Sequence, residues 1–283
     1  MQIDLHFITA LFYLGAAALA WWPGLTTAGS SAARTAAVPA RLPMRLAGIS
    51  SLLCIAIAWH GFNLWRDLFA AAGFNLSFAT SLSLITFGTL AIYIVIGFSI
   101  SLSHLVARYL APVAVLVVVL PVFLPAEYVV PYGSQPLFKL HFVVAILAYV
   151  LFTIAALHAL LMTAMENWLH QGYLPPQAGG LPPLIRMEKW LFRLLLAAFV
   201  LLTATLISGV FFSEALFGKA FQFNHKTLFA IVSWAIFAWL LFGHWRFGWR
   251  GRKAIRLTLI GFVALLLAYI GSKFVLQILL GRV

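Results

Sequence analysis

The sequence predicts an all-α membrane protein, a polytopic transmembrane helical bundle with about eight spans. Composition is the first reason: of the 283 residues, 64% are hydrophobic and 8% are charged, against about half and about a quarter in a soluble globular protein. Spacing is the second reason, because eight apolar segments recur along the chain and about 20 apolar residues suffice to cross the hydrocarbon layer as a helix. Little length remains for a soluble domain, so we expect residues 1–283 to form a single integral membrane domain.

The predicted spans follow one another in order, with two longer connections rich in Pro, Gly and small residues. They are residues 3–22, 45–65, 79–103, 109–126, 138–165, 188–212, 225–247 and 254–280. The first has no basic region before its apolar run, and that run is too long for a signal peptide, so we interpret it as a retained span. The fourth is short and contains Pro112, Pro121 and Pro125, so we expect it to be kinked and packed behind its neighbours.

The cations predict the orientation of these spans. Twelve Lys or Arg residues lie in loops after the odd-numbered spans, against five after the even-numbered spans and at the termini. Because cytoplasmic loops carry the excess of cations, we predict a bacterial inner-membrane protein with both termini in the periplasm. The placement of the cations at span ends also argues against a nucleic-acid partner, despite the net charge of +12.

Several classes of chemistry find no support in the sequence. Cys54 is the sole cysteine, which excludes an internal disulfide, a dithiol redox pair and covalent haem attachment through C-x-x-C-H. The six acidic residues form no pair typical of a glycosidase or a protease, and none lies in mid-membrane, where an ion pump needs one. We therefore predict that the chain is not an enzyme.

Two histidines are predicted to lie at one membrane level. His141 and His225 stand near the starts of the fifth and seventh spans, and so at the outer face. Two neutral imidazoles at one level could serve as axial ligands of a flat metal macrocycle. Ala145, Ala148 and Ala155 share the helical face below His141, which would let a ring or a helix approach closely. The residues alone favour the plainer interpretation of interfacial histidines and ordinary helix packing.

The other histidines leave more alternatives open. His60 lies inside the second span, where an ionisable residue is a functional hypothesis by default. It could be a third residue of the metal site, a deeper ligand, or a hydrogen-bonded contact between helices. His158 and His244 lie about 25 and 28 Å below the outer histidine of the same helix, so neither shares a site with it. We interpret them as interfacial residues or, with His104, as a second site at the inner face.

Two stretches, "KLHFVVAILAYVLFTIAALHALL" and "SGVFFSEALFGKAFQFNHKTLFAIVSWAIFAWLLFGHWRFGWRGRKA", resemble the cytochrome c assembly family. The likeness is to its CcsA/CcmC/HemX-like proteins, above all to an eight-span, YpjD-like branch. It covers almost the whole chain and is strongest over 138–283. In that family two external histidines ligate haem, so the resemblance implies that His141 and His225 bind the metal of a non-covalent b-type haem, with His60 as a further cofactor-binding candidate. Lys139 and Lys226 could pair with its propionates.

One loop departs from the family pattern. Haem-presenting members carry W-G-x-x-W-x-W-D before the second external histidine, where this chain has "SGVFFSEALFGKAFQFNHK", without a tryptophan. The resemblance implies a haem-handling protein of cytochrome c-type biogenesis, with haem and other assembly proteins or a membrane partner as its partners. A membrane scaffold or regulator of a partner complex, with a degenerate haem site, remains the alternative.

Overall fold

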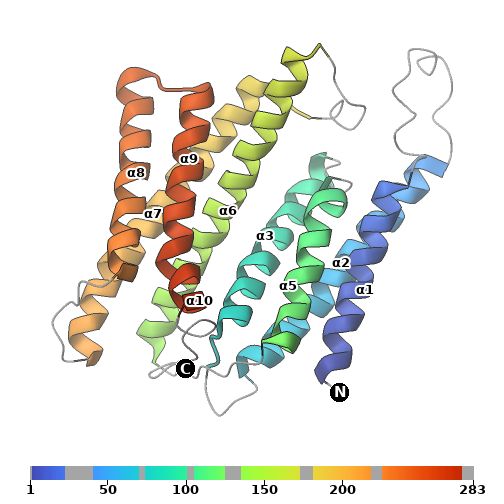
Figure 1. Cartoon of the computed structure of the whole chain (residues 1–283), viewed down its shortest axis with the longest axis horizontal. Helices are drawn as coiled ribbons and strands as arrows, with labels where there is room; N and C mark the ends of the chain where they lie inside the picture. The colour runs from blue at the N-terminus through green and yellow to red at the C-terminus, as the bar shows by residue number, and fades with distance from the viewer. Residues whose placement is uncertain are drawn as a thin grey trace. The chain divides into compact units, whose positions relative to one another are not determined.

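The structure is a computed structural model in which every element of the described residues is a helix (Figure 1). It describes residues 2–22, 41–69, 74–100, 105–124, 135–172, 181–217 and 225–275. Within these ranges seven helical stretches are long and apolar enough to cross a membrane, and a shorter apolar helix covers Leu5–Trp21. The predicted all-α, multi-pass membrane architecture is therefore confirmed.

The helices match the predicted spans in order. Their bounds are α1 (Gln2–Trp21), α2 (Arg41–Phe69), α3 (Phe78–Ile100), η3 (Val106–Leu110), α5 (Ala111–Phe123), α6 (Pro136–His170), α7 (Leu184–Phe217), α8 (His225–Phe247), α9 (Gly251–Leu266), η5 (Leu267–Gly271) and α10 (Ser272–Phe274). The elements η3 and η5 are π-helical turns. One crossing stretch, Val106–Phe123, consists of η3 and α5, and another, Gly251–Gly271, consists of α9 and η5.

Two compact units divide the chain. The first holds α1, α2, most of α3, η3 and α5, and the second holds most of α6 and all of α7 to α10. Their bounds are Met1–Phe69, Leu82–Pro125 and Trp168–Leu181 for the first, and Ala70–Ser81, Ala126–Asn167 and Pro182–Val283 for the second. The single membrane domain over 1–283 stays a prediction.

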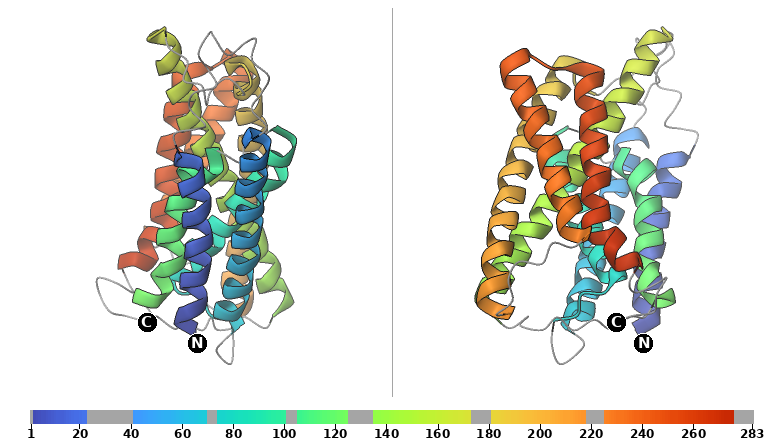
Figure 2. Two further views of the ribbon diagram at one scale, coloured as in Figure 1. Left: turned by 90° about the vertical axis from the view of Figure 1, so that its right-hand side faces the viewer. Right: turned by 60° about the vertical axis from the view of Figure 1, so that its left-hand side comes forward.

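In the first unit α1 packs against both α2 and α5 (Figure 2). The irregular start of α5 follows from Pro112, which has no N–H and so leaves the Arg108 carbonyl without its usual helical donor. The π-helical turn η3 lies there, and the Trp21 indole N–H donates to the Arg108 carbonyl at 3.0 Å. One face of α5 is buried, as predicted, but Leu116 on the other face is 73% exposed.

In the second unit α6, α8 and α9 meet halfway along their lengths, with α8 and α9 side by side (Figure 2). The Phe237 ring stacks on Phe152 at 4.0 Å between centroids. On its other side it faces Gly261, where an added Cβ would lie 2.8 Å from the ring. The Ser233 hydroxyl donates to the Gly261 carbonyl at 2.9 Å. Small residues thus allow two helix backbones to approach closely, as is common in membranes.

Candidate functional site

His141 lies in the second turn of α6, because that helix begins at Pro136 rather than at the predicted residue 138. Its imidazole is half-buried, and its Nδ1 lies 2.7 Å from the Ser208 hydroxyl near the end of α7. Gly209 is in ordinary contact with the ring, since a Cβ there would lie 3.6 Å from Cε1. The close approach of α6 and α7 at this point therefore fixes the His141 ring.

The Ser208 hydroxyl also decides which His141 nitrogen carries a proton. Its hydrogen is directed at the Ala204 carbonyl, 2.7 Å away, so the oxygen accepts from the imidazole instead of donating to it. This arrangement assigns the proton to Nδ1 and the lone pair to Nε2. A histidine with one nitrogen anchored as a donor and the other basic is the form that binds metals.

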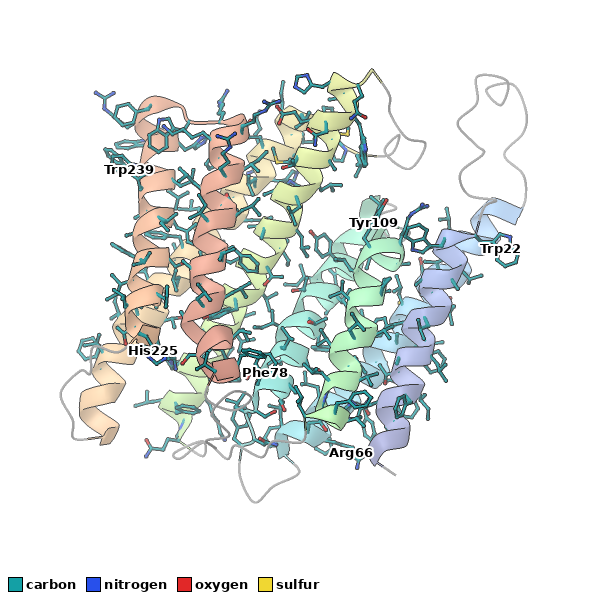
Figure 3. All side chains as sticks on the ribbon, in the orientation of Figure 1. Trp22, Arg66, Phe78, Tyr109, His225 and Trp239 are labelled. Atoms are coloured by element: carbon teal, nitrogen blue, oxygen red, sulfur yellow. The ribbon has the colours of Figure 1, made fainter. Side chains whose placement is uncertain are left out.

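His225 is the first residue of α8 and is exposed (Figure 3). Its Nε2 lies 3.1 Å from the hydroxyl of Ser272, the first residue of α10. As with His141, a serine from another helix holds the ring.

Lys226 follows His225 in the chain and also lies near His141. Its ammonium group is close enough to act electrostatically on the His141 imidazole, and it lies 5.2 Å from the centre of the Tyr269 ring. The starts of α6 and α8, the end of α7 and α10 therefore occupy one end of the second unit, the lower end in Figure 1. This cluster of His141, Ser208, His225, Lys226 and Ser272 is called the outer histidine site below.

The faces beneath these histidines differ from one another. Ala148 and Ala155 on α6 are buried, as the small-residue stripe predicts. On α8, Val232 is 40% exposed and the buried face of the helix runs through Ser233 and Phe237. Of the two faces, the one beneath His141 is therefore the more enclosed.

Among the described residues no three His, Cys, Asp or Glu side chains gather into a metal-ion site. Closed structural zinc centres need four such ligands, whereas haem iron needs two axial ligands or fewer from the protein. The ligand role of His141 and His225 stays a prediction.

His60 belongs to the first unit and is 1% exposed. Its Nδ1 lies 3.1 Å from the Tyr13 hydroxyl, and its Nε2 lies 2.8 Å from the Ser83 hydroxyl. Its ring also meets the Phe87 ring edge-on. Of the three interpretations of His60, these contacts correspond to the hydrogen-bonded contact between helices, while its role as a ligand remains untested.

The contact of His60 with Tyr13 is one of a row of polar contacts between α1 and α2. The Asn63 amide donates to the Thr9 hydroxyl at 2.9 Å and to the Leu5 carbonyl at 3.1 Å. One turn further, His6 lies 3.5 Å from the Asp67 carboxylate. Neither His6 nor Asn63 was predicted as a site residue. The signal that could have found them is polar residues spaced i, i+3 and i+7 on both helices.

His158 and His244, predicted to lie toward the inner face, make separate contacts. His158 donates from Nε2 to the Met187 carbonyl at 2.9 Å, and His244 donates from Nδ1 to the Trp249 carbonyl at 2.9 Å. His104, the predicted third member of an inner site, lies outside the described residues. Most of the loop that lacks tryptophan lies outside them too, although its first part, up to Phe217, continues α7 as helix.

Sequence reasoning missed the two serines that hold the outer histidines. Ser208 could have been found, because the small pair Ser208–Gly209 at a span end is typical of a close helix approach. Ser272 had no comparable signal, since its partner depends on how α8 and α10 are rotated about their axes.

The family model described as "Cytochrome C assembly protein" matches residues 47–280, most of the chain. The chain belongs to this family. It is 34% identical over 160 residues to the inner membrane protein YpjD of Escherichia coli (strain K12), which is 56% of this chain and 60% of that protein. An uncharacterised 28.8 kDa protein of Azospirillum brasilense is 37% identical over 142 residues, 50% of this chain and 52% of that protein.

More distant members of the family carry a functional name. The cytochrome c biogenesis protein CcsA of Prochlorococcus marinus (strain AS9601) is 36% identical over 83 residues, which cover 29% of this chain and 27% of that protein. The matches thus span between about a quarter and three fifths of the length of these relatives. No solved structure matches the chain.

Proposed function

We propose that this chain binds b-type haem non-covalently at the outer face of a bacterial inner membrane and handles or delivers it during cytochrome maturation. The observation that carries the proposal is the outer histidine site, where two imidazoles from different helices occupy one end of one unit. Membership of the cytochrome c assembly family supports the proposal, as does the biogenesis name of the CcsA relatives.

The residues of the site fit haem. Neutral imidazoles are established axial ligands of haem iron. Since Ser208 engages Nδ1 of His141, Nε2 is the nitrogen through which His141 would bind iron. In His225 the serine engages Nε2, so this ring would bind metal through Nδ1 or exchange Ser272 for the metal. The Lys226 ammonium, which acts on His141, would neutralise a propionate carboxylate.

When bound, haem would supply an iron centre that accepts the two nitrogens. The residues of the chain would hold the haem and orient the two imidazole rings. The two serines set the rings before binding, which lowers the entropy lost on ligation. Nothing in this role requires a catalytic step, so we propose a carrier rather than an enzyme. We also propose His60 as a helix contact outside the haem site, and periplasmic termini on the cation count.

A second candidate is a scaffold or regulator of a partner membrane complex, with a degenerate haem site. The absence of tryptophan between Ser208 and Lys226 favours it. Purification of a partner with the chain, unchanged when His141 and His225 are both replaced by alanine, would support this function over haem binding.

An absorbance titration of the detergent-solubilised protein with haem tests the first proposal. We expect a Soret band for the unchanged protein, and at least a tenfold weaker affinity in His141→Ala and in His225→Ala, because each removes one axial nitrogen. His170→Ala is the matched control, since His170 is an exposed histidine at the far end of α6. A missing Soret band, or one that both outer variants keep at full affinity, contradicts the proposal.

A further inference from the structure

A pocket of about 580 Å³ lies between α7 and α8 at the opposite end of the second unit from the outer histidine site. The first three turns of α7 form one wall, and the last turns of α8 with Arg250 form the other. Figure 3 labels Trp239 toward this end of α8 and His225 at the other. We refer to this cavity as the basic pocket.

Positive charge predominates in the basic pocket. Lys189, Arg193 and Arg250 line it, with Glu188 as the single carboxylate. The Arg250 guanidinium pairs with Glu188 at 3.3 Å. Within the described ranges no carboxylate forms an ion pair with Lys189 or Arg193, so the pocket carries two cations in excess.

Both walls also carry apolar side chains that face outward. Ile185 is 74% exposed, Leu196 is 56% exposed and Trp245 is 82% exposed. Because these residues belong to membrane-crossing helices, their exposed surfaces are the ones that lipid chains would cover. A ligand that satisfies the whole pocket therefore needs an anionic group beside a hydrocarbon part.

The floor of the pocket is held in a fixed shape. The His244 imidazole stacks on the Phe192 ring at 3.4 Å between centroids and donates to the Trp249 carbonyl. The turn that follows α8 needs left-handed backbone at Gly248 (φ 66°) and Gly251 (φ 55°), which glycine adopts at little cost. This turn brings Arg250 back to Glu188 across the mouth of the pocket.

From these observations we infer that the basic pocket binds the phosphate headgroup of an anionic phospholipid. Lys189 and Arg193 would contact the phosphate, and the acyl chains would lie along Ile185, Leu196 and Trp245. Cations at span ends attract anionic lipids, each contributing about a fivefold gain in affinity. A soluble phosphate fits less well, because it would leave the apolar wall without a partner. The inference is independent of haem binding at the other end of the unit.

Native mass spectrometry of the full chain in detergent, with added phosphatidylglycerol or phosphatidylcholine, tests this site. We expect at least tenfold tighter binding of phosphatidylglycerol to the unchanged protein. The double variant Lys189→Gln/Arg193→Gln should lose that preference, and Arg193→Lys with Lys189 retained should keep most of it. Both residues are exposed, so the charge is removed without disturbing the core.

Arg246→Gln is the matched control, because Arg246 is an exposed cation at the same end of α8 but does not line the pocket. It should leave the preference unchanged. Equal binding of the two lipids, or a preference that the double variant retains, overturns the inference. Full displacement of phosphatidylglycerol by millimolar inorganic phosphate also overturns it, since the pocket would then select the free anion.

Discussion

The interior of the first unit and the outer end of the second unit use histidine in opposite ways. His60 is enclosed, with hydroxyl groups on both ring nitrogens and an aromatic ring beside it. His141 is half-buried with Nδ1 anchored, and His225 is exposed. The contrast teaches that position within a span says little about role. Under the proposed function, a binding histidine differs from a structural one in holding a basic nitrogen at an accessible surface.

Replacement of His60 by alanine should show the largest effect on stability. It leaves the Tyr13 and Ser83 hydroxyl groups without a partner and opens a cavity among three helices, so we expect the free energy of unfolding to fall by about 2–3 kcal/mol. His141→Ala should cost less than about 1 kcal/mol, since its site is already partly open. Unfolding of the purified protein in detergent, followed by circular dichroism, measures both values.

In haem binding the order of the two variants should be the opposite. His141→Ala should weaken the affinity for haem, whereas His60→Ala should keep the affinity of the unchanged protein. If His60→Ala abolished haem binding while its helical signal was retained, His60 would belong with the outer histidines as a ligand.

Replacement of Ser208 by alanine tests whether the hydrogen bond to His141 matters for haem binding. Because Ser208 orients His141 through Nδ1, its loss should weaken haem affinity about tenfold while changing stability by less than about 0.5 kcal/mol. Thr205→Ala is the control, since the Thr205 hydroxyl bonds to the Leu201 carbonyl of its own helix. Equal effects of the two substitutions on the haem titration would mean that Ser208 has no orienting role.

A smaller loss of stability than that of His60→Ala is expected from Tyr13→Phe. This change removes one hydroxyl group from His60 but keeps the ring that packs beside it, so it should cost about 0.5–1.5 kcal/mol. Haem affinity should not change. A cost as large as that of His60→Ala would place most of the energy of the contact in this one hydrogen bond.

The spans were predictable because they depend on local sequence alone. Runs of apolar residues set the length and order of the helices, and the periodicity of a helix placed His141 and His225 at span starts. The apolar run also predicted that the fourth segment forms one span, but it did not predict the π-helical turn before Pro112.

The partners of the histidines were harder to predict, because they depend on how neighbouring helices are rotated and packed. Ser83 and Tyr13 meet His60 from two other helices, and no pattern within α2 encodes that. The turn that brings Arg250 to Glu188 is likewise set by two glycines with positive φ rather than by charge spacing.

The stacked rings of Phe152 and Phe237, with Gly261 beside them, join α6, α8 and α9 near the middle of their lengths. Phe237 stands 12 residues after His225, and Phe152 stands 11 residues after His141, which gives lever arms of about 18 and 16 Å. A rocking of α8 by about 5° about this point would displace the His225 ring by about 1.6 Å. Metal–ligand distances tolerate only about 0.2 Å. Under the proposed function, a small change in helix packing at Phe152 and Phe237 would thus be enough to weaken the binding of a shared ligand by the two imidazoles.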